Sequence, residues 1–483
     1  MRIPFQNRAR RFSRASRVID PKGCRPLGAT FAGDPIFEPS DSLSSLVFAS
    51  TGGGKTTRVA MTAIEALLVH GDRTIVINDV KLEIAPQIAE MCEMYGWNFG
   101  VIDDAGAMGE EYPYRLLINP ISHIVESAKR GDPMLPLMID GFLHTLIPEP
   151  KGGQSGQDRN FYWRESPRGY AATALRKLLD YRHLATPGGL SDLLTDPEMF
   201  ESAMRILAEE GEGPLKGRAK RILSAQQRNP ELFEQHITAA QTALRIFAEG
   251  PLHDAGSDAE ISHEDILSAK DGPWVICITN PLQYVEQLGP SIALQFNAFM
   301  DVQLSGKVGK TDFILDEFCA GPFRPALSRI HVQRAFKSRV ILIAQSRQQS
   351  IDAYGREFTA MLEENCAIKQ LLRVTQPEEA ERWAKVMGDS RVVSASMGAN
   401  TRDLTLQTTF NHGKERNFTA QQLLSLPPDE QIILLAGVGF IHCKTLAQNQ
   451  FAPMAFDLAD NPREGGRLEP DIKVTFQTPN GGS

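Results

Sequence analysis

The chain has 483 residues, of which 42% are hydrophobic and 23% charged, proportions typical of a soluble globular protein. A formal net charge of −8 excludes a general attraction to nucleic acid, so any DNA contact has to come from a local basic surface. The six cysteines are scattered without a CxxC pair, a pattern that suits a reducing cytosol. Since no run of about 18 apolar residues is present, the sequence predicts no transmembrane helix and a cytoplasmic protein.

The first 40 residues are rich in Arg, Pro and Gly. They predict a basic, irregular N-terminal arm over residues 1–40. Its arginines either stay solvated or contact anionic lipid, nucleic acid or an acidic partner.

A strand–helix–strand pattern follows in residues 41–120. Its apolar strands are Leu46–Ala49, Thr74–Asn78 and Asn98–Ile102, and helical periodicity occupies the segments between them. Apolar strands that alternate with helices predict a mostly parallel sheet covered on both faces.

Strand signals nearly vanish in residues 121–245, where helix formers dominate and predict an all-α inserted domain. The sheet resumes in residues 246–452, with strands predicted at Trp274–Thr279, Asp312–Leu315, Val340–Ala344, Ala367–Val374, Glu430–Ala436 and Phe440–Thr445. Residues 453–483 are rich in Pro, Gly and Asp and predict a flexible C-terminal tail. The predicted fold class is therefore α/β with an all-α insertion.

A glycine-rich segment joins the first predicted strand to a helix, which is the setting of a phosphate-binding loop. Backbone N–H groups of such a loop surround phosphate oxygens, and the helix N-terminus adds its positive dipole end. Lys55 is expected to reach the β- and γ-phosphates of ATP, and the Thr56 hydroxyl to bind Mg²⁺. Ala49 stands where the usual pattern has its first glycine. The predicted nucleotide-binding residues are Ser50, Thr51, Gly52, Gly53, Gly54, Lys55, Thr56 and Thr57.

Two carboxylates end the apolar strand Phe313-Ile314-Leu315. In a Walker B arrangement, Asp316 holds Mg²⁺ and Glu317 polarises the attacking water. Together with the upstream loop in the same predicted sheet, the pair predicts nucleotide hydrolysis.

The next strand, Val340–Ala344, ends in Gln345. Its amide is predicted to contact the γ-phosphate or the attacking water and to report the nucleotide state. A run of basic residues from Arg324 to Arg339 precedes this strand. It is either a solvated face or the source of an arginine finger that completes a neighbouring subunit's site.

The ordered series of motifs resembles that of the VirD4/TraG-type coupling proteins of type IV secretion and conjugation. The resemblance extends from about Leu46 to Lys444. Besides the phosphate-binding loop it rests on Asp79-Val80-Lys81-Leu82-Glu83, Asn119-Pro120-Ile121, Asp316-Glu317-Phe318, Gln345-Ser346, Tyr354-Gly355 and Asn365-Cys366.

This resemblance implies a RecA-like P-loop ATPase that forms a homo-oligomer, expected to be a hexamer. It implies ATP and Mg²⁺ as cofactors, and Arg334 as the arginine finger. The implied partners are single-stranded DNA, a relaxase or secreted proteins, together with type IV secretion components. Typical members carry N-terminal transmembrane helices, whereas this sequence predicts none. Contact with the membrane is therefore expected to be indirect and peripheral at the inner membrane.

The sequence leaves three functions open. The first is a coupling-protein-like motor that moves DNA or a protein–DNA complex towards a secretion channel. The second is an FtsK/HerA-like DNA translocase in segregation, repair or defence. The third is a docking receptor that uses nucleotide only as an assembly switch.

Overall fold

A 12-stranded sheet forms the centre of the protein. The computed structural model describes residues 18–19, 22–40, 43–148, 161–268, 270, 272–336, 338–400, 405–463, 466 and 468–476. In the sheet the strand order is β3-β2-β15-β14-β11-β4-β10-β9-β5-β8-β6-β7. All pairs from β11 to β7 are parallel, and those from β11 to β3 are antiparallel. The strands are β2 (Pro26–Ala29), β3 (Pro35–Phe37), β4 (Ser45–Ala49), β5 (Arg73–Asn78), β6 (Asn98–Ile102), β7 (Arg115–Leu116), β8 (Trp274–Ile278), β9 (Lys310–Leu315), β10 (Ser338–Ala344), β11 (Ile368–Leu372), β14 (Glu430–Leu435) and β15 (Gly439–Lys444).

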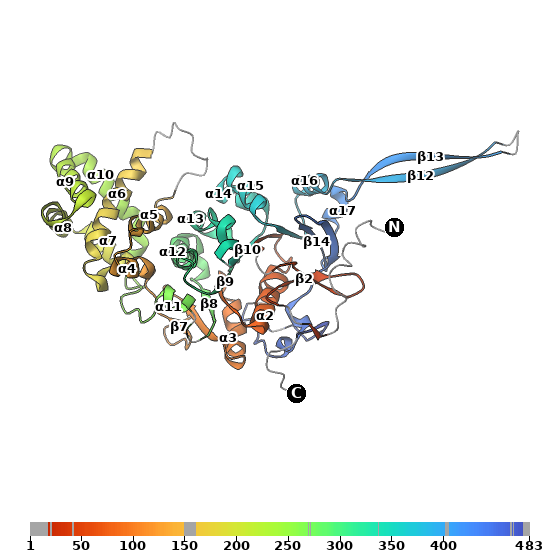
Figure 1. The fold of residues 1–483 in the computed structure, drawn as a ribbon, viewed down its shortest axis with the longest axis horizontal. Coiled ribbons are helices and arrows are strands. Elements are labelled where there is room, and N and C mark those ends of the chain that lie inside the picture. The colour runs from red at the N-terminus through yellow and green to blue at the C-terminus, as the bar shows by residue number, and fades with distance from the viewer. Residues whose placement is uncertain are drawn as a thin grey trace.

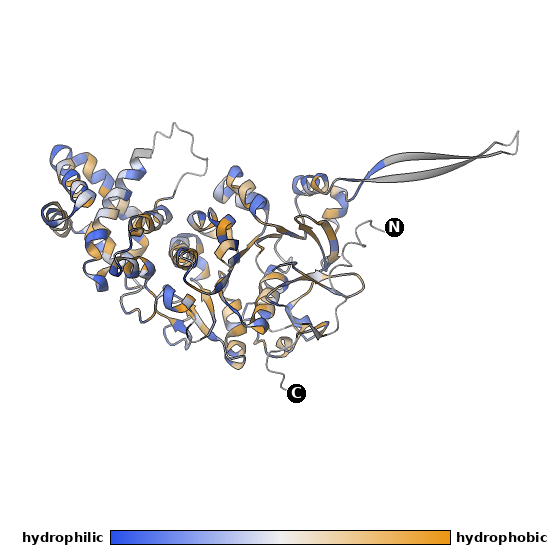
Figure 2. Ribbon diagram, in the orientation of Figure 1, coloured by the Kyte–Doolittle hydropathy of each residue, from blue (hydrophilic) through white to orange (hydrophobic). Residues whose placement is uncertain are grey.

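Helices cover both faces of the sheet, as continuous apolar strands require (Figure 1). Alternate residues of one strand enter opposite cores, so Leu46 of β4 packs in one core and Val47 in the other. In Figure 2 the central strands are largely orange and lie between helices with blue outer surfaces. One face is covered by η1 (Thr56–Ala60), α2 (Met61–His70) and α3 (Ile84–Met94), and the other by α11 (His263–Ser268), α12 (Val285–Leu304), α13 (Arg324–Leu327), η6 (Ile330–Phe336), α14 (Arg347–Tyr354), α15 (Arg356–Asn365), α16 (Pro377–Met387) and α17 (Ala420–Leu424).

A separate group of helices forms its own hydrophobic core at one end of the molecule (Figure 1). Three of these helices start with the same device, a capping side chain followed by proline. Thr186, Asp196 and Asn229 accept backbone N–H groups of the first turn, and each next residue is a proline whose missing N–H costs nothing there. The helices are α4 (Ser122–Lys129), α5 (Leu135–Leu146), α6 (Phe161–Leu178), α7 (Pro187–Thr195), α8 (Pro197–Glu210), α9 (Gly213–Arg228) and α10 (Pro230–Leu244).

A long antiparallel hairpin projects from the body of the protein (Figure 1). It consists of β12 (Asp389–Asn400) and β13 (Thr405–Arg416), and the sequence analysis did not predict it. Within the described residues its strands pair only with each other.

Both ends of the chain differ from their predictions. Residues 22–40 are not an irregular arm, because β2 and β3 extend the main sheet and Arg25 and Glu38 are buried. Residues 1–17 of the predicted arm lie outside the described residues. The predicted tail contains β17 (Val474–Phe476), which pairs in parallel with β1 (Val18–Ile19) and β16 (Phe451–Ala452). Val474 and Phe476 are buried against the core beneath α2, and this burial explains the order of the segment.

Buried charges tie the N-terminal segment to the sheet. The Arg339 guanidinium donates to Glu38, to the Gly23 carbonyl and, at 2.8 Å, to Asp312. Asp312 also accepts from Arg73 at 2.8 Å, while Glu38 accepts from the side chain of Arg25 at 3.3 Å. We call Arg25, Glu38, Arg73, Asp312 and Arg339 the buried charge cluster. It lies where β9 and β10 begin, at the sheet edge opposite their carboxyl ends.

Candidate active site

The glycine-rich loop follows β4 directly and leads into η1. Gly52 and Gly54 have φ angles of +73° and +78°, which L side chains rarely adopt. A β-carbon on Gly53 would lie 2.8 Å from the carbonyl oxygen of Ser50. The loop therefore needs these glycines. Ala49, which replaces the usual first glycine, is buried at the end of β4, where its methyl group packs in the core.

The two acids after β9 sit on an unusual backbone turn. Glu317 has φ 52° and ψ 47°, a left-handed conformation that is uncommon for a residue other than glycine. The turn is held on both sides, because Asn78 donates to the Asp316 carbonyl at 2.8 Å and the Ala320 N–H donates to the Glu317 carbonyl at 2.8 Å. Strained backbone of this kind persists only where its surroundings fix it, and it concentrates at functional sites.

The structure brings most of the predicted site residues together at the carboxyl edge of neighbouring strands β4, β10 and β9. Lys55 forms a salt bridge with Glu317, and both side chains are less than a tenth exposed. The amide of Gln345 donates to the same carboxylate oxygen at 3.2 Å. The Thr56 hydroxyl lies 3.4 Å from a carboxylate oxygen of Asp316.

The electrostatics of this cluster fit a cation and a phosphate chain. Burial, reinforced by the neighbouring Glu317 charge, raises the pKa of Asp316 to about 7. Asp316 Oδ1 and Glu317 Oε2 are buried without a hydrogen-bond partner. Within the described ranges, no group of three or more His, Cys, Asp or Glu forms a self-sufficient metal site. The donors suit Mg²⁺, which commonly takes one or two carboxylates and completes its shell with water and substrate phosphates.

Glu83 belongs to this site, although the sequence analysis gave it no role. Its carboxylate accepts the Thr56 hydroxyl at 2.7 Å and lies 3.7 Å from the Lys81 ammonium. A hydroxyl donates a single hydrogen, and Glu83 is its nearer acceptor, so the lone pairs of the Thr56 oxygen remain for a metal. The Asp79-x-Lys81-x-Glu83 segment was the available signal, but its spacing alone does not show that Glu83 meets Thr56.

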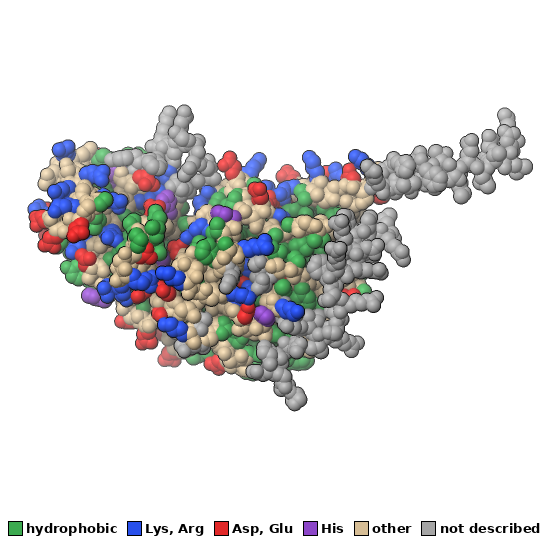
Figure 3. Space-filling view, in the orientation of Figure 1, with side chains coloured by type: hydrophobic (Ala, Val, Ile, Leu, Met, Phe, Trp, Pro, Cys, Tyr) green, Lys and Arg blue, Asp and Glu red, His purple; other side chains and the backbone are tan. Residues whose placement is uncertain are grey.

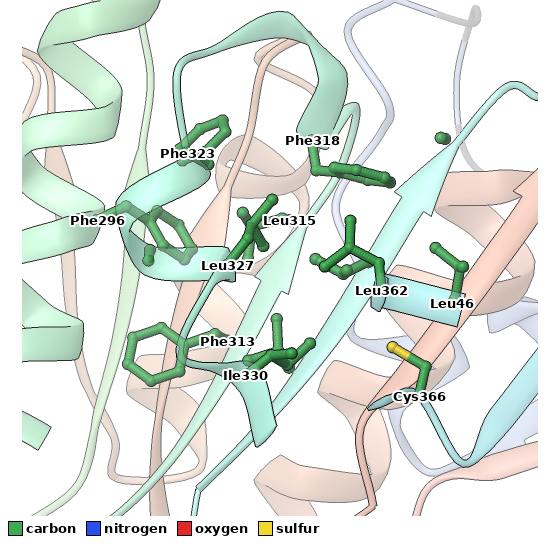
Figure 4. Close-up of a cluster of buried hydrophobic side chains, with 14 of the residues drawn as sticks. Leu46, Phe296, Phe313, Leu315, Phe318, Phe323, Leu327, Ile330, Leu362 and Cys366 are labelled. Atoms are coloured by element: carbon green, nitrogen blue, oxygen red, sulfur yellow. The ribbon is translucent and has the colours of Figure 1, made fainter. Parts of the chain in front are cut away.

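Tyr354 fixes the loop that follows Glu317. Its hydroxyl lies 2.6 Å from the carbonyl oxygens of both Phe318 and Gly321, and its ring stacks on Phe318. Figure 4 shows Phe318 in the apolar cluster beneath this loop, together with Leu315 and Phe323. Tyr354 therefore acts on Glu317 indirectly, by holding the residues that follow it.

We expect Tyr354→Phe to lower the rate of ATP hydrolysis about tenfold, while ATP affinity changes little. The substitution keeps the stacked ring and removes only the hydroxyl that restrains the loop, and small misplacements of reacting groups are costly. Steady-state hydrolysis and equilibrium ATP binding measure the two effects. Equal losses in both quantities would instead indicate general damage to the fold.

The basic run resolves into residues with different surroundings. Arg334 is exposed on η6, before β10 begins, and therefore lies at the sheet edge opposite the other site residues. Since β10 is about 20 Å long, Arg334 does not reach the phosphate-binding loop of its own chain. Arg329 is paired with Asp301, and Arg339 belongs to the buried charge cluster. Arg339 is fully buried and so is excluded as a finger for a neighbouring subunit.

The fold and this site define a class. A mostly parallel sheet with a glycine-rich loop after β4, acids after β9 and an amide after β10 is a RecA-like P-loop NTPase fold with added helices. The predicted fold class is confirmed.

Comparison with known proteins agrees with the resemblance read from the motifs. Residues 310–428 match the protein family described as "TraM recognition site of TraD and TraG". The crystal structure of the bacterial conjugative coupling protein TrwB in complex with sulphate is 17% identical, with a TM-score of 0.66, and the match covers 92% of this chain and 93% of that one. TrwB with ADP and Mg²⁺ gives 17% identity and a TM-score of 0.65, with coverage of 92% and 93%. TrwB with a non-hydrolysable ATP analogue is 16% identical with a TM-score of 0.63, and the match covers 91% of this chain and 92% of that one.

No curated protein matches the chain by sequence. The similarity to this family is thus confined to residues 310–428, while the fold resembles that of TrwB over most of the chain. Across the described ranges, every helix is too short or too polar to span a bilayer.

Proposed function

We propose that this protein is an ATP-hydrolysing, coupling-protein-like motor that moves DNA or a protein–DNA complex towards a type IV secretion channel. The observation that carries the proposal is the convergence of Lys55, Asp316, Glu317 and Gln345 at one sheet edge of this fold. The TrwB structures with ADP and Mg²⁺ and with an ATP analogue support ATP and Mg²⁺ as its cofactors.

The geometry supports a role for each of these residues. The loop from Ser50 to Thr57 would hold the phosphate chain, and Thr56 and Asp316 would hold Mg²⁺, which supplies positive charge to the phosphates. Lys55 pairs with Glu317 in this structure, and on nucleotide binding it would pair with a phosphate instead. Glu317 is then free to accept a hydrogen bond from the attacking water, and Gln345 can hold the other side of that water.

The helical domain is the proposed place of cargo contact. Arg218, Lys220 and Arg221 are exposed on α9 and can pair with DNA phosphates. Figure 3 shows Lys and Arg side chains on this end of the molecule mixed with acidic ones, so the proposed contact is local. Proposed partners are single-stranded DNA, a relaxase or secreted proteins, and type IV secretion components. The match to a TraM recognition site supports a protein partner at residues 310–428.

The test is ATP hydrolysis by the assembled oligomer with and without single-stranded or double-stranded DNA. We expect hydrolysis to be stimulated by DNA, and the Lys55→Ala variant to bind ATP weakly and to be inactive. A rate that no DNA changes would contradict the motor function, and unchanged ATP affinity in Lys55→Ala would show that the loop is misassigned.

The predicted trans role of Arg334 has a separate test. We expect Arg334→Ala to bind ATP normally and to hydrolyse it about a thousandfold more slowly in the oligomer, because an arginine finger acts on the transition state. Mixing Arg334→Ala subunits with Glu317→Gln subunits should restore part of the activity. In such a ring the second subunit offers its Arg334 to a site that still has Glu317. Normal hydrolysis by Arg334→Ala alone would place Arg334 outside the reaction, and mixed rings without activity would contradict its action in trans.

A further inference from the structure

Arg373 lies beside the phosphate-binding loop, although it is distant from that loop in the sequence. It follows β11, the neighbour of β4 on the side away from β10, and Leu372 is the register partner of Ala49. A β-carbon built on Gly52 would lie 3.4 Å from Nη1 of Arg373. The guanidinium therefore reaches the outer side of the loop in the same chain.

The backbone of Arg373 is held in place against an intrinsic preference. Its φ angle is 56°, in the left-handed region that side chains other than glycine adopt at a cost of about 1 kcal/mol or more. The Ser50 hydroxyl donates to the Arg373 carbonyl at 3.1 Å, so the phosphate-binding loop itself holds this turn. The conformation points to a position maintained for the site, as it does for Glu317.

The charges around the loop distinguish Arg373 from its neighbours. Lys55 is paired with Glu317, and Arg58 donates to the Pro428 carbonyl while its side chain packs over Gly54. Arg373 is exposed, and no hydrogen bond or ion pair from the described residues reaches its guanidinium. A cation at the mouth of a phosphate-binding loop with no protein partner is available for an anion of the ligand.

We propose that Arg373 binds the phosphate chain of the nucleotide in its own subunit. It does so from the outer side of the loop, opposite Asp316, the carboxylate that would hold Mg²⁺. The planar guanidinium can donate two parallel hydrogen bonds to phosphate oxygens, which a lysine in the same place cannot do. This inference rests on the proposed nucleotide binding and adds a cis arginine to the trans arginine expected at Arg334.

The experiment measures the affinity of full-length Arg373→Asn for fluorescent ADP and ATP, and for inorganic tripolyphosphate as a competitor. Asparagine tolerates the left-handed backbone, so the variant should keep the wild-type unfolding temperature. We expect ADP, ATP and tripolyphosphate each to bind about tenfold more weakly, the loss of one charge-assisted hydrogen-bonding group. Arg373→Lys should recover only part of the affinity. Arg228→Asn, at an exposed arginine of the helical domain, is the matched control and should bind as the wild type does.

The outcomes separate this inference from the proposed function. If Lys55→Ala loses nucleotide while Arg373→Asn binds all three ligands within twofold of wild type, the site stands and the role of Arg373 is overturned. If nucleotides bind weakly but tripolyphosphate competes as in the wild type, Arg373 contacts the base or ribose, and the phosphate contact is again overturned. If Lys55→Ala itself binds normally, the proposed function fails first.

Discussion

Glu317→Gln is expected to bind ATP at least as tightly as the wild type and to hydrolyse it at least a hundredfold more slowly. The carboxylate accepts hydrogen bonds from both Lys55 and Gln345. An amide at this position cannot take a proton from water, so general-base assistance of about 10²–10⁴-fold is lost. The amide also competes less for Lys55, which leaves the lysine freer for phosphate. Single-turnover hydrolysis and equilibrium ATP binding measure the two effects.

The same variant separates a motor from a docking receptor. A motor loses transport with hydrolysis, whereas a receptor that uses nucleotide only as an assembly switch keeps its function as long as ATP binds and the oligomer forms. Gln345→Glu serves as a companion variant, because it alters the partner of Glu317 and leaves the carboxylate in place. Transport that persists in an assembled Glu317→Gln oligomer would rule out the motor.

Arg339→Ala is expected to lower the free energy of unfolding by about 3–5 kcal/mol. The guanidinium is fully buried and neutralises Glu38 and Asp312, which both remain buried when it is removed. Burial already raises the pKa of Glu38, even with Arg339 present to lower it. Without Arg339, Glu38 keeps only Arg25 and Asp312 keeps only Arg73. Each carboxylate loses a charge-assisted hydrogen bond while it stays buried, and this loss destabilises the folded state.

Urea unfolding followed by tryptophan fluorescence measures this loss. Arg334→Ala is the matched control, because it removes an exposed arginine only a few residues away and should leave the unfolding midpoint unchanged. A stable Arg339→Ala protein would mean that the N-terminal segment is not held to the sheet by these charges.

The central strands could be predicted because burial on both faces makes them continuous apolar runs. Residues of β4, β9 and β10 are wholly buried apart from the first of β9, and all three strands were recognised. The edge strands gave no such signal. β2 (Pro26–Ala29) has the sequence PLGA, whose proline and glycine argue against a strand. It forms a strand because neighbouring strands of the sheet pair with it. The hairpin of β12 and β13 was missed because serines, glycines and asparagines interrupt its strand-forming Val, Thr and Phe residues.

The candidate site likewise has a part that the sequence predicted and a part that it did not. The phosphate-binding loop and the acids after β9 could be predicted, because the residues of each motif are adjacent in the sequence. Glu83, Tyr354 and Arg373 reach the site from other strands and helices, and only the sheet order places them there. The buried charge cluster was invisible for a related reason. Arg339 appeared as one member of a basic run, and its acidic partners lie 27 and 301 residues away.

The small sheet of β1, β17 and β16 also has a mechanical consequence. It brings the first and last described segments of the chain side by side as parallel neighbours. A force that pulls residues 18 and 476 apart therefore acts along the strands, in shear, and has to break their hydrogen bonds together instead of unzipping them one by one. Phe451 of β16 and Phe476 of β17 stack on each other and pack in the hydrophobic core, which holds both strands in place. A tether attached at either of these segments would thus transmit tension into the body of the protein without first separating β1 and β17.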